Sequence, residues 1–478
     1  MRVLLIEDDQ AFASAFTNAL QDLEPSIDCL HAWSREGAVA ALGSSEYDTI
    51  LCDLSIPSTD GALDEDVIHG ISVYQQARKL HPGTQILILT GHSEEQIDFV
   101  TTAIQEAPRE DLFGMRRPMA LTRLIRKVNL DDCILSLVEF ARAQQQMDDT
   151  IEIQERGIAL TSAERRLLRI FAQRHNGAII DVLPLSGGLS QSKTLRVQVQ
   201  DSGLVTRAVA VAKLGSLESV TDEETRYRKH IAPLLGVGSF TSFSDEIRAG
   251  AGSVAGLFYT LAEEYQTSFF DVLARSERDA LLVLDRLVEL ERPWTSSWAS
   301  KQIRVEDLRR SMISDDQFIP YADSVRALIP LDQVERCRVT VRQCPQHGDL
   351  HGLNILVSGE NRPVLIDYGD VGIWCACYDM IVLELSLLFH PTSVAVRGDW
   401  PSVEQAARWN DLDVYVADCP FPEFVRRCRA NAIRLAAARR DVFANAYSFA
   451  VRQLKYPNTD KNLALAVARC AARELLRT

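Results

Sequence analysis

Short apolar runs alternate with amphipathic segments over the first 142 residues. Four runs have the length of buried strands, which predicts strands at 2–6, 49–54, 85–91 and 123–128. Apolar residues at helical spacing, as in 10–23 and 70–80, separate these runs. Strands that are apolar on both faces and joined by helices form a parallel sheet covered on both sides. The pattern therefore predicts a doubly wound α/β domain over residues 1–142.

The pattern changes after residue 142. Residues 143–176 are mostly helical in pattern, and the stretch "LTSAERRLLRIFAQRHNG" offers Thr161 or Ser162 as N-cap and Gly177 as a stop signal. Strand-like stretches follow, ending in glycine, and they suggest a small antiparallel meander. Helical patterns dominate from Thr221 onward. We expect a helical connector at 143–176, a strand-rich lobe at 177–262 and a helix-rich lobe at 263–478.

Composition and charge narrow the class of protein. A chain of 478 residues with 46% hydrophobic residues can build two to four domains with proper cores, which excludes a disordered tail protein. The formal net charge of -15 argues against a general binder of nucleic acid or anionic membranes, because phosphate-rich partners demand clustered Lys and Arg. About -12 of this charge falls within the first 145 residues, which indicates distinct modules.

The cysteines and the apolar runs bear on localisation. The ten cysteines form no CxxC pair, and Cys375 and Cys377 are spaced too closely for the usual zinc site. We expect free thiols in a reducing compartment. No signal-peptide pattern and no apolar run of about 18 residues is present. The expectation is therefore a cytoplasmic protein without a membrane partner.

Acidic residues follow the predicted strands of the first domain. The polar residues at or just after strand ends are Glu7, Asp8, Asp9, Asp53, Thr90 and Lys127. The carboxyl ends of parallel strands meet at one edge of a sheet, where ligands bind. Carboxylates gathered there repel each other unless a cation such as Mg²⁺ neutralises them. The lysine and the threonine can contact an added phosphoryl group.

Four motifs in order resemble the response-regulator receiver domain: "LLIEDD", "LCDLSIP", "LILTG" and "RLIRKVNLDD". The resemblance implies that Glu7 and Asp8 are the metal-binding acid pair and that Asp53 is both phosphoacceptor and metal ligand. It further implies Thr90 as the switch hydroxyl, Lys127 as the phosphate-contacting cation, and an upstream histidine kinase or other phosphodonor as partner. Asp9 is expected to start the following helix.

The first domain also departs from the receiver pattern. Residues 58–69 lengthen the loop after Asp53, and residues 105–120 enlarge the region before the last strand. Val128 stands where the family has proline, and Leu124 replaces the usual aromatic switch residue. These changes leave the phosphorylation chemistry in place, but the loss of the aromatic residue puts the ordinary relay from threonine to aromatic ring in doubt.

The stretch "QHGDLHGLNILV" carries the second candidate site. Alone, His347, Asp349 and His351 suit a metal centre or a hydrolase. However, Asp367 follows Asn354 by thirteen residues, at the other end of a predicted β-hairpin. Closing this hairpin brings Asn354 and Asp367 together as oxygen ligands for Mg²⁺ and leaves Asp349 free to orient a substrate hydroxyl.

Phosphoryl transfer needs further parts, and the sequence offers them upstream. The turn "LSGGLSQSK" has Gly187, Gly188 and Ser190, whose backbone N–H groups can approach phosphate oxygens. Lys213 lies near the end of a predicted strand, and Glu224 at the start of the following helix. This is the order of parts in a kinase.

These residues resemble the aminoglycoside phosphotransferase and choline kinase family, the small-molecule relatives of protein kinases, with "HGDLHGLNIL" as the most specific motif. The resemblance implies a two-lobed protein-kinase-like domain from about Gly177 onward, with Mg²⁺ and ATP. The implied roles are catalytic base for Asp349, Mg²⁺ ligands for Asn354 and Asp367, phosphate binding for Lys213 and ion-pair partner of that lysine for Glu224. Glu223 is the alternative partner, and backbone groups at 261–263 hold adenine.

Neighbouring residues are assigned supporting roles. His347 is expected to support the loop by hydrogen bonding, and His351 to be a surface residue. Asp370 and Asp379 can reinforce the metal site or anchor the loop. We favour structural roles for both, especially for Asp379, which opens the apolar helix "MIVLELSLLFH".

Three hypotheses for the whole chain follow. The leading one is an ATP-dependent phosphotransferase that acts on a small-molecule or protein hydroxyl and is regulated in cis by phosphorylation of Asp53. The alternative is a receiver-controlled signalling scaffold with a nucleotide-binding pseudokinase domain. A DNA-binding regulator, suggested by the helix after Thr161, is disfavoured because no Arg- and Lys-rich recognition helix follows. The sequence identifies no acceptor, and it leaves a homodimer open.

Overall fold

The computed structural model describes residues 1–91, 102, 107–185, 192–393 and 400–477, and these residues fall into two compact units. The first unit comprises Met1–Pro184, Gln191–Thr221 and Phe243–Thr260. The second comprises Leu185–Ser190, Asp222–Ser242 and Leu261–Thr478.

A parallel five-stranded sheet forms the N-terminal part of the first unit, with strand order β2-β1-β3-β4-β7. Its strands are β1 (Arg2–Ile6), β2 (Asp28–Ala32), β3 (Thr49–Asp53), β4 (Gln85–Thr90) and β7 (Thr122–Arg126). Its helices are α1 (Gln10–Leu23), α2 (Arg35–Ser44), α3 (Val67–Leu80) and α5 (Leu130–Thr150). The short strands β5 (Arg109–Glu110) and β6 (Met119–Ala120) pair with each other before β7. The predicted doubly wound α/β domain is confirmed.

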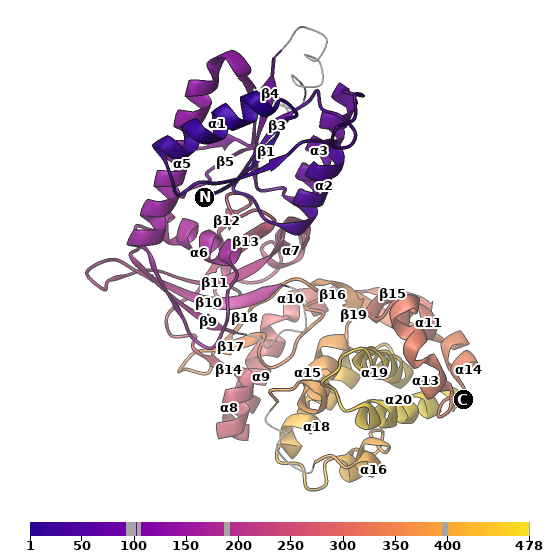
Figure 1. Ribbon diagram of the computed structural model, residues 1–478. Coiled ribbons are helices and arrows are strands. Elements are labelled where there is room, and N and C mark those ends of the chain that lie inside the picture. The colour runs from indigo at the N-terminus through magenta and orange to yellow at the C-terminus, as the bar shows by residue number, and fades with distance from the viewer. Residues whose placement is uncertain (92–101, 103–106, 186–191, 394–399, 478) are drawn as a thin grey trace. The chain divides into compact units, whose positions relative to one another are not determined.

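Alternate residues of the parallel strands fill two cores. Val3 and Leu5 of β1 pack with α1 and α5, whereas Leu4 and Ile6 pack with α2 and α3. This alternation follows from the two-residue period of a strand. Figure 1 shows α1 and α5 on one face of the sheet and α2 and α3 on the other. Both faces are therefore buried, which explains why these strands are apolar throughout.

A six-stranded sheet, ordered β12-β13-β11-β10-β9-β8, completes the first unit. Its strands are β8 (Glu152–Glu155), β9 (Ile179–Pro184), β10 (Lys193–Gln200), β11 (Thr206–Ser216), β12 (Ser242–Ile247) and β13 (Val254–Thr260). The helix α6 (Ser162–Arg174) buries Leu167, Leu168 and Phe171 in the same hydrophobic core as Val197 and Phe258 of the sheet. The predicted antiparallel meander corresponds to β9, β10 and β11.

The second unit is rich in helices, as the sequence predicts. Its longer helices are α8 (Phe269–Arg275), α9 (Glu277–Leu290), α11 (Val305–Met312), α15 (Tyr378–Phe389), α18 (Pro422–Leu435), α19 (Arg439–Gln453) and α20 (Lys461–Leu476). Shorter ones are α10 (Arg292–Thr295), α12 (Asp315–Phe318), α13 (Ala322–Arg326), α14 (Leu331–Arg336), α16 (Val403–Ala406) and α17 (Leu412–Tyr415). The helix α7 (Leu217–Arg226) joins the two units and continues as a π-helical turn, Tyr227–Ile231.

Two small sheets position the loop of interest in the second unit. One contains β14 (Thr267–Ser268), β17 (Ile355–Val357) and β18 (Pro363–Leu365), and the other β15 (Ala299–Arg304), β16 (Arg338–Gln346) and β19 (Gly372–Cys375). Every residue of α15 is buried, so this helix forms the centre of the unit. The loop 347–354 begins where β16 ends and leads into β17.

Some strands do not follow the sequence pattern. β2 and β8 are short strands at the edges of their sheets and contain charged or polar residues, so they lack the apolar run that marks a central strand. β8 lies within residues 143–176, the range expected to be a helical connector, and pairs in parallel with β9. In the described part of the chain, none of the helices has both the length and the apolar character that crossing a membrane requires.

Candidate functional sites

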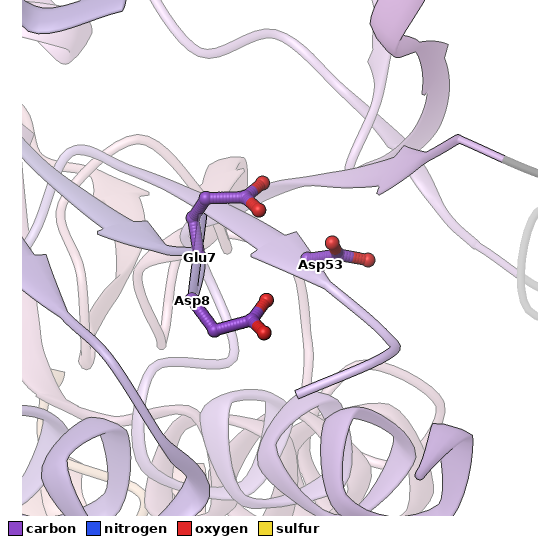
Figure 2. A group of neighbouring side chains, drawn as sticks. All are labelled: Glu7, Asp8 and Asp53. Atoms are coloured by element: carbon purple, nitrogen blue, oxygen red, sulfur yellow. The ribbon is translucent and has the colours of Figure 1, made fainter. Parts of the chain in front are cut away.

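Three carboxylates meet at the carboxyl ends of the parallel strands, as expected. Glu7 and Asp8 follow β1, and Asp53 ends β3. Each offers an oxygen within 4.8 Å of the others, and Figure 2 shows the three side chains side by side. Asp9 instead caps α1 by accepting hydrogen bonds from the N–H groups of Ala11 and Phe12.

Lys127 lies directly after β7 and joins the cluster. Its Nζ is 2.6 Å from Oδ2 of Asp53 and 2.8 Å from Oε2 of Glu7. Burial lowers the pKa of Lys127, but the bonds to Asp53 and Glu7 outweigh this effect and raise it. The ammonium is therefore charged and placed beside the predicted phosphoacceptor.

Electrostatics favour a cation at this cluster. Burial raises the pKa of Glu7 to about 7, with a further contribution from the charge of Asp53 and against the opposing effect of Lys127. A hard cation with oxygen ligands would relieve this repulsion, so the residues fit Mg²⁺. Thr90 ends β4, and Leu124 lies exposed on β7.

The inserted loop after Asp53 adds a residue that the sequence reasoning missed. The negative charge of Asp8 is the main cause that raises the pKa of Glu65, so these two carboxylates are neighbours. The bridge between Ile56 and Asp66 closes the loop at its base. The sequence offered no signal for Glu65 beyond the acidic composition of the insertion.

The loop 347–354 is fixed by a buried carboxylate. Asp379, in the first turn of α15, accepts hydrogen bonds from the backbone N–H groups of His347 at 2.6 Å and Gly348 at 2.9 Å. His347 donates from Nε2 to the carbonyl oxygen of Ile366 at 3.0 Å. Burial raises the pKa of Asp379 to about 6, against the effects of His347 and the two N–H groups. The supporting roles expected for His347 and Asp379 agree with these contacts.

Asn354 connects this loop to the hairpin. Its Nδ2 donates to the backbone carbonyl of Asp349 at 2.9 Å, and its own carbonyl accepts from the N–H of Ile366 at 3.1 Å. Its Oδ1 is buried and has no hydrogen-bond partner. Asp367 follows β18 with a φ of 64°. A buried amide oxygen without a hydrogen-bond partner, on a hairpin that also carries the carboxylate of Asp367, fits the Mg²⁺ site predicted from the sequence.

The carboxylate of Asp349 has two cationic or titratable neighbours. Nε2 of His351 lies 3.6 Å from its Oδ2, and Nη2 of Arg452 lies 3.6 Å from its Oδ1. His351, expected to be a surface residue, is partly buried, and its ring packs against His390 with centroids 4.5 Å apart. Arg452 was missed because it lies on α19, far along the chain and outside any motif.

The nucleotide-binding candidates are only partly described. Lys213 is buried on β11, and its Nζ donates to Oγ1 of Thr194 at 3.2 Å. Oε1 of Glu224 accepts from Nε of Arg228 at 2.7 Å, whereas Oε1 of Glu223 accepts from the N–H of Tyr368 at 3.4 Å. The expected phosphate-binding residues Gly187, Gly188 and Ser190 lie outside the described residues.

Known proteins resemble the chain in two separate parts. Residues 3–107 match the model of the response regulator receiver domain, and residues 181–408 match that of the phosphotransferase enzyme family. The transcriptional regulatory protein QseB of Haemophilus influenzae is 29% identical over 181 residues, which cover 36% of this chain and 73% of that protein.

Solved structures were found for both parts. A CheY-like receiver domain protein from Methanospirillum hungatei is 19% identical with a TM-score of 0.22, and the match covers 31% of this chain and 97% of that chain. Aminoglycoside phosphotransferase APH(4)-Ia, solved in a ternary complex with ADP and hygromycin B, is 14% identical with a TM-score of 0.35. That match covers 62% of this chain and 95% of the other. The chain therefore carries an N-terminal response regulator receiver domain and a C-terminal domain of the phosphotransferase enzyme family, as the motifs indicated.

Proposed function

We propose that the protein is an ATP-dependent phosphotransferase that phosphorylates a hydroxyl group and is regulated in cis by phosphorylation of Asp53. The observation that carries the catalytic part is the fixed loop 347–354. Asp379 holds its backbone, and the orphan Oδ1 of Asn354 provides a cation ligand near Asp349. These are the parts that phosphoryl transfer requires, because its catalysis is mainly positioning and electrostatic stabilisation.

Each residue then has a defined task. Asp349 orients the acceptor hydroxyl and receives its proton, and Lys213 neutralises phosphate oxygens of ATP. Asn354 and Asp367 would hold Mg²⁺, which when bound offsets the charge of the transferring phosphoryl group.

We propose that one of two neighbouring acids, Glu224 or its alternative Glu223, is the ion-pair partner of Lys213. Glu224 already bonds to Arg228, a neighbour one turn away on the same helix. The buried Glu223 contacts the backbone of Tyr368, directly after the predicted metal ligand Asp367. Glu223 is thus in contact with the metal-binding motif, and Glu224 with its own helix.

Regulation in cis is supported by a joint within the first unit. We call it the receiver joint: Glu46, His81 and Gly83 of the receiver domain and the turn 248–253 between β12 and β13. Oγ of Ser253 donates to Oε1 of Glu46 at 2.6 Å, and Nδ1 of His81 lies 3.1 Å from Oε2 of Glu46. The backbone of Gly83 exchanges hydrogen bonds with the same turn at 3.1 and 3.0 Å.

The receiver joint lies at the start of the strands that carry the receiver chemistry. Glu46 precedes β3, which ends at Asp53, and Gly83 precedes β4, which ends at Thr90. On the other side, the turn leads into β13, whose Leu257 pairs with Lys213 of β11. A change at the phosphoacceptor Asp53 can therefore reach β11, the strand of Lys213. The route runs along β3 or β4 to the receiver joint, through the turn 248–253 into β13, and across the pairing of β13 with β11.

The catalytic proposal is tested by measuring ATP turnover in the full chain with Mg²⁺. Asp349→Asn should lower turnover by at least about 100-fold, since the proton acceptor is lost. The control Asp323→Asn changes an exposed aspartate of the same unit and should leave turnover unchanged. Equal turnover in Asp349→Asn and the parent would instead support a nucleotide-binding scaffold.

The regulatory proposal is tested by treating the full chain with acetyl phosphate and measuring ATP turnover and Asp53 phosphorylation. The parent should change its turnover, and Asp53→Asn should not, whereas the exposed control Asp22→Asn should behave as the parent. The double variant Glu46→Gln with Ser253→Ala should still accept phosphate on Asp53 but lose the turnover response. A full response in that variant would show that the signal takes another route.

A further inference from the structure

Two cationic side chains lie beside the catalytic loop on a segment outside the family match, which ends at residue 408. Arg452 belongs to the last turn of α19, and Lys455 follows that helix. Both come from the same unit as Asp349. Because they lie next to Asp349, the proposed proton acceptor, they can influence which substrate binds there to receive the phosphoryl group.

Arg452 is held in place by phenol groups. Its Nε donates to Oη of Tyr456 at 3.3 Å, and its Nη1 to Oη of Tyr378 at 3.4 Å. The ring of Tyr378 is buried and stacks on Trp374 with centroids 5.1 Å apart. Two nitrogens of the guanidinium are therefore held by neutral phenol groups.

The third nitrogen of Arg452 faces carboxylates without a direct hydrogen bond. Nη2 lies 3.6 Å from Oδ1 of Asp349 and 3.8 Å from Oδ2 of Asp370. These separations exceed the usual length of about 2.9 Å for such bonds, so the donor remains open to another acceptor atom. Burial and the charge of Asp349 raise the pKa of Asp370, which places this acid in the same electrostatic environment.

Lys455 lies half-buried with its Nζ 5.0 Å from the ring centroid of Tyr456. Burial and the charge of Arg452 lower its pKa, against the opposing charges of Asp370 and Asp349, so Lys455 shares the surroundings of Arg452 and of both carboxylates. Within the described part of the chain, no ion pair joins Lys455 to a carboxylate. Because Asp370 and Asp349 act on this ammonium without an ion pair to it, a further anionic group can bind it directly.

His390 and the aromatic side chains near Asp349 add no negative charge to that of Asp349 and Asp370. Burial, together with His351, lowers the pKa of His390 to about 3, so this imidazole is neutral at pH 7. Trp374 and Tyr456 contribute aromatic surface. A polycationic acceptor would meet Arg452 and Lys455 as like charges, whereas an acid group can bind to the open nitrogen of Arg452 and to Lys455.

We propose that the acceptor is a small hydroxyl compound that carries an acid group, and that Arg452 and Lys455 bind this group while Asp349 receives the hydroxyl. This inference rests on the proposed phosphotransferase function and adds the class of its substrate. The acceptor oxygen forms a bond to the γ-phosphorus of ATP, its proton passes to Asp349, and the bond from that phosphorus to the β-phosphate oxygen breaks to release ADP. The step involves no oxidation or reduction.

The test measures ADP release by the full chain, with ATP and Mg²⁺, over a panel of hydroxyl compounds matched in size. The panel contains hydroxy acids such as glycerate, hydroxyl phosphates such as glycerol 3-phosphate, neutral glycerol, ethanolamine, choline and an aminoglycoside. At least one acid should stimulate ADP release over the basal rate. Comparing the hydroxy acids with the hydroxyl phosphates shows whether the bound acid group is a carboxylate or a phosphate. Absence of any basal or stimulated turnover would refute the phosphotransferase function itself.

Variants separate acceptor binding from catalysis. Lys455→Gln should raise the KM for the stimulating acid by about tenfold and change kcat little, whereas Lys455→Arg should keep the KM near that of the parent. Arg452→Gln should affect both constants, because it also borders Asp349. Lys301→Gln, an exposed lysine on β15, is the matched control and should behave as the parent. Stimulation by amines or glycerol equal to that by the acids, or basal turnover that no acid increases, would overturn the inference.

Discussion

Two residues near Asp349 adopt left-handed backbone conformations, and they show how the catalytic loop is shaped. Gly348 has a φ of 83°, and Asp367 has a φ of 64°. Glycine adopts this region at no steric cost, and aspartate is one of the few other residues that tolerate it. The backbone of the loop therefore depends on the residue types of the motif as well as on their side-chain chemistry.

A methyl group at position 348 should disrupt the loop. A Cβ there would lie 2.2 Å from the carbonyl oxygen of Asp370, and the positive φ would strain any L side chain. Gly348→Ala should therefore lower the free energy of unfolding by about 1–3 kcal/mol and reduce ATP turnover more than tenfold. Denaturant unfolding and turnover assays check both. Gly359→Ala, where a Cβ meets open space, is the control, and equal effects in the two variants would contradict the explanation.

At this scale the motif residues were predictable and their partners were not. Asp349, Asn354 and Asp367 lie within a short stretch whose hairpin can be recognised locally. Arg452 reaches Asp349 from α19, and Glu65 reaches Asp8 from an inserted loop. Single charged residues in helices and loops are usually solvated, so the sequence offered no reason to select these two.

The segment between the two domains contains elements of the second sheet. β8 adds an edge strand to that sheet, and α6 covers one face of it with Leu167, Leu168 and Phe171. The strands before and after α6, β8 and β9, both belong to the second sheet, and α6 packs in the hydrophobic core of that sheet. The sequence identified α6 because its cap and its apolar spacing are local signals. It missed β8 because a four-residue polar strand has none.

The start of α6 should contribute measurably to stability. Oγ1 of Thr161 accepts from the N–H of Glu164 at 3.2 Å, and the Glu164 carboxylate accepts from the N–H of Thr161. Loss of this cap in Thr161→Ala should lower the free energy of unfolding by about 1 kcal/mol in denaturant titrations. Thr150→Ala, at the exposed end of α5, should change it by less than about 0.5 kcal/mol. A loss no larger than that of the control would argue against a role for the cap.

Across the first unit, the receiver joint links stability to pH. Burial lowers the pKa of His81, but the bonds to Glu46 and to the carbonyl of Leu42 outweigh it and raise the pKa above its ordinary value. A raised folded-state pKa stabilises the protein below the unfolded-state value of about 6.5 and loses this effect as pH rises through the folded-state value. The receiver joint should therefore weaken as the pH rises above the folded-state pKa of His81.

The comparison of the parent with His81→Gln measures this effect. The parent should be more stable than the variant by up to about 1 kcal/mol below pH 6.5, and this difference should shrink as the pH rises. The size is modest because Glu46 is partly exposed and screened by solvent. Unfolding titrations at several pH values provide the data. A difference that grows with pH would refute the assigned charge of His81.

The sequence by itself determined the two domain families, the central strands and the motif residues of both sites. Each of these depends on side chains that are close in the chain or on a periodic pattern within one element, so the information is local. The tertiary structure decided the edge strands, the receiver joint and the position of Arg452. These depend on contacts between residues from 26 positions apart, as in the pairing of β1 with β2, to 207 positions apart, as between Glu46 and Ser253. Only the packing of whole elements brings such residues together.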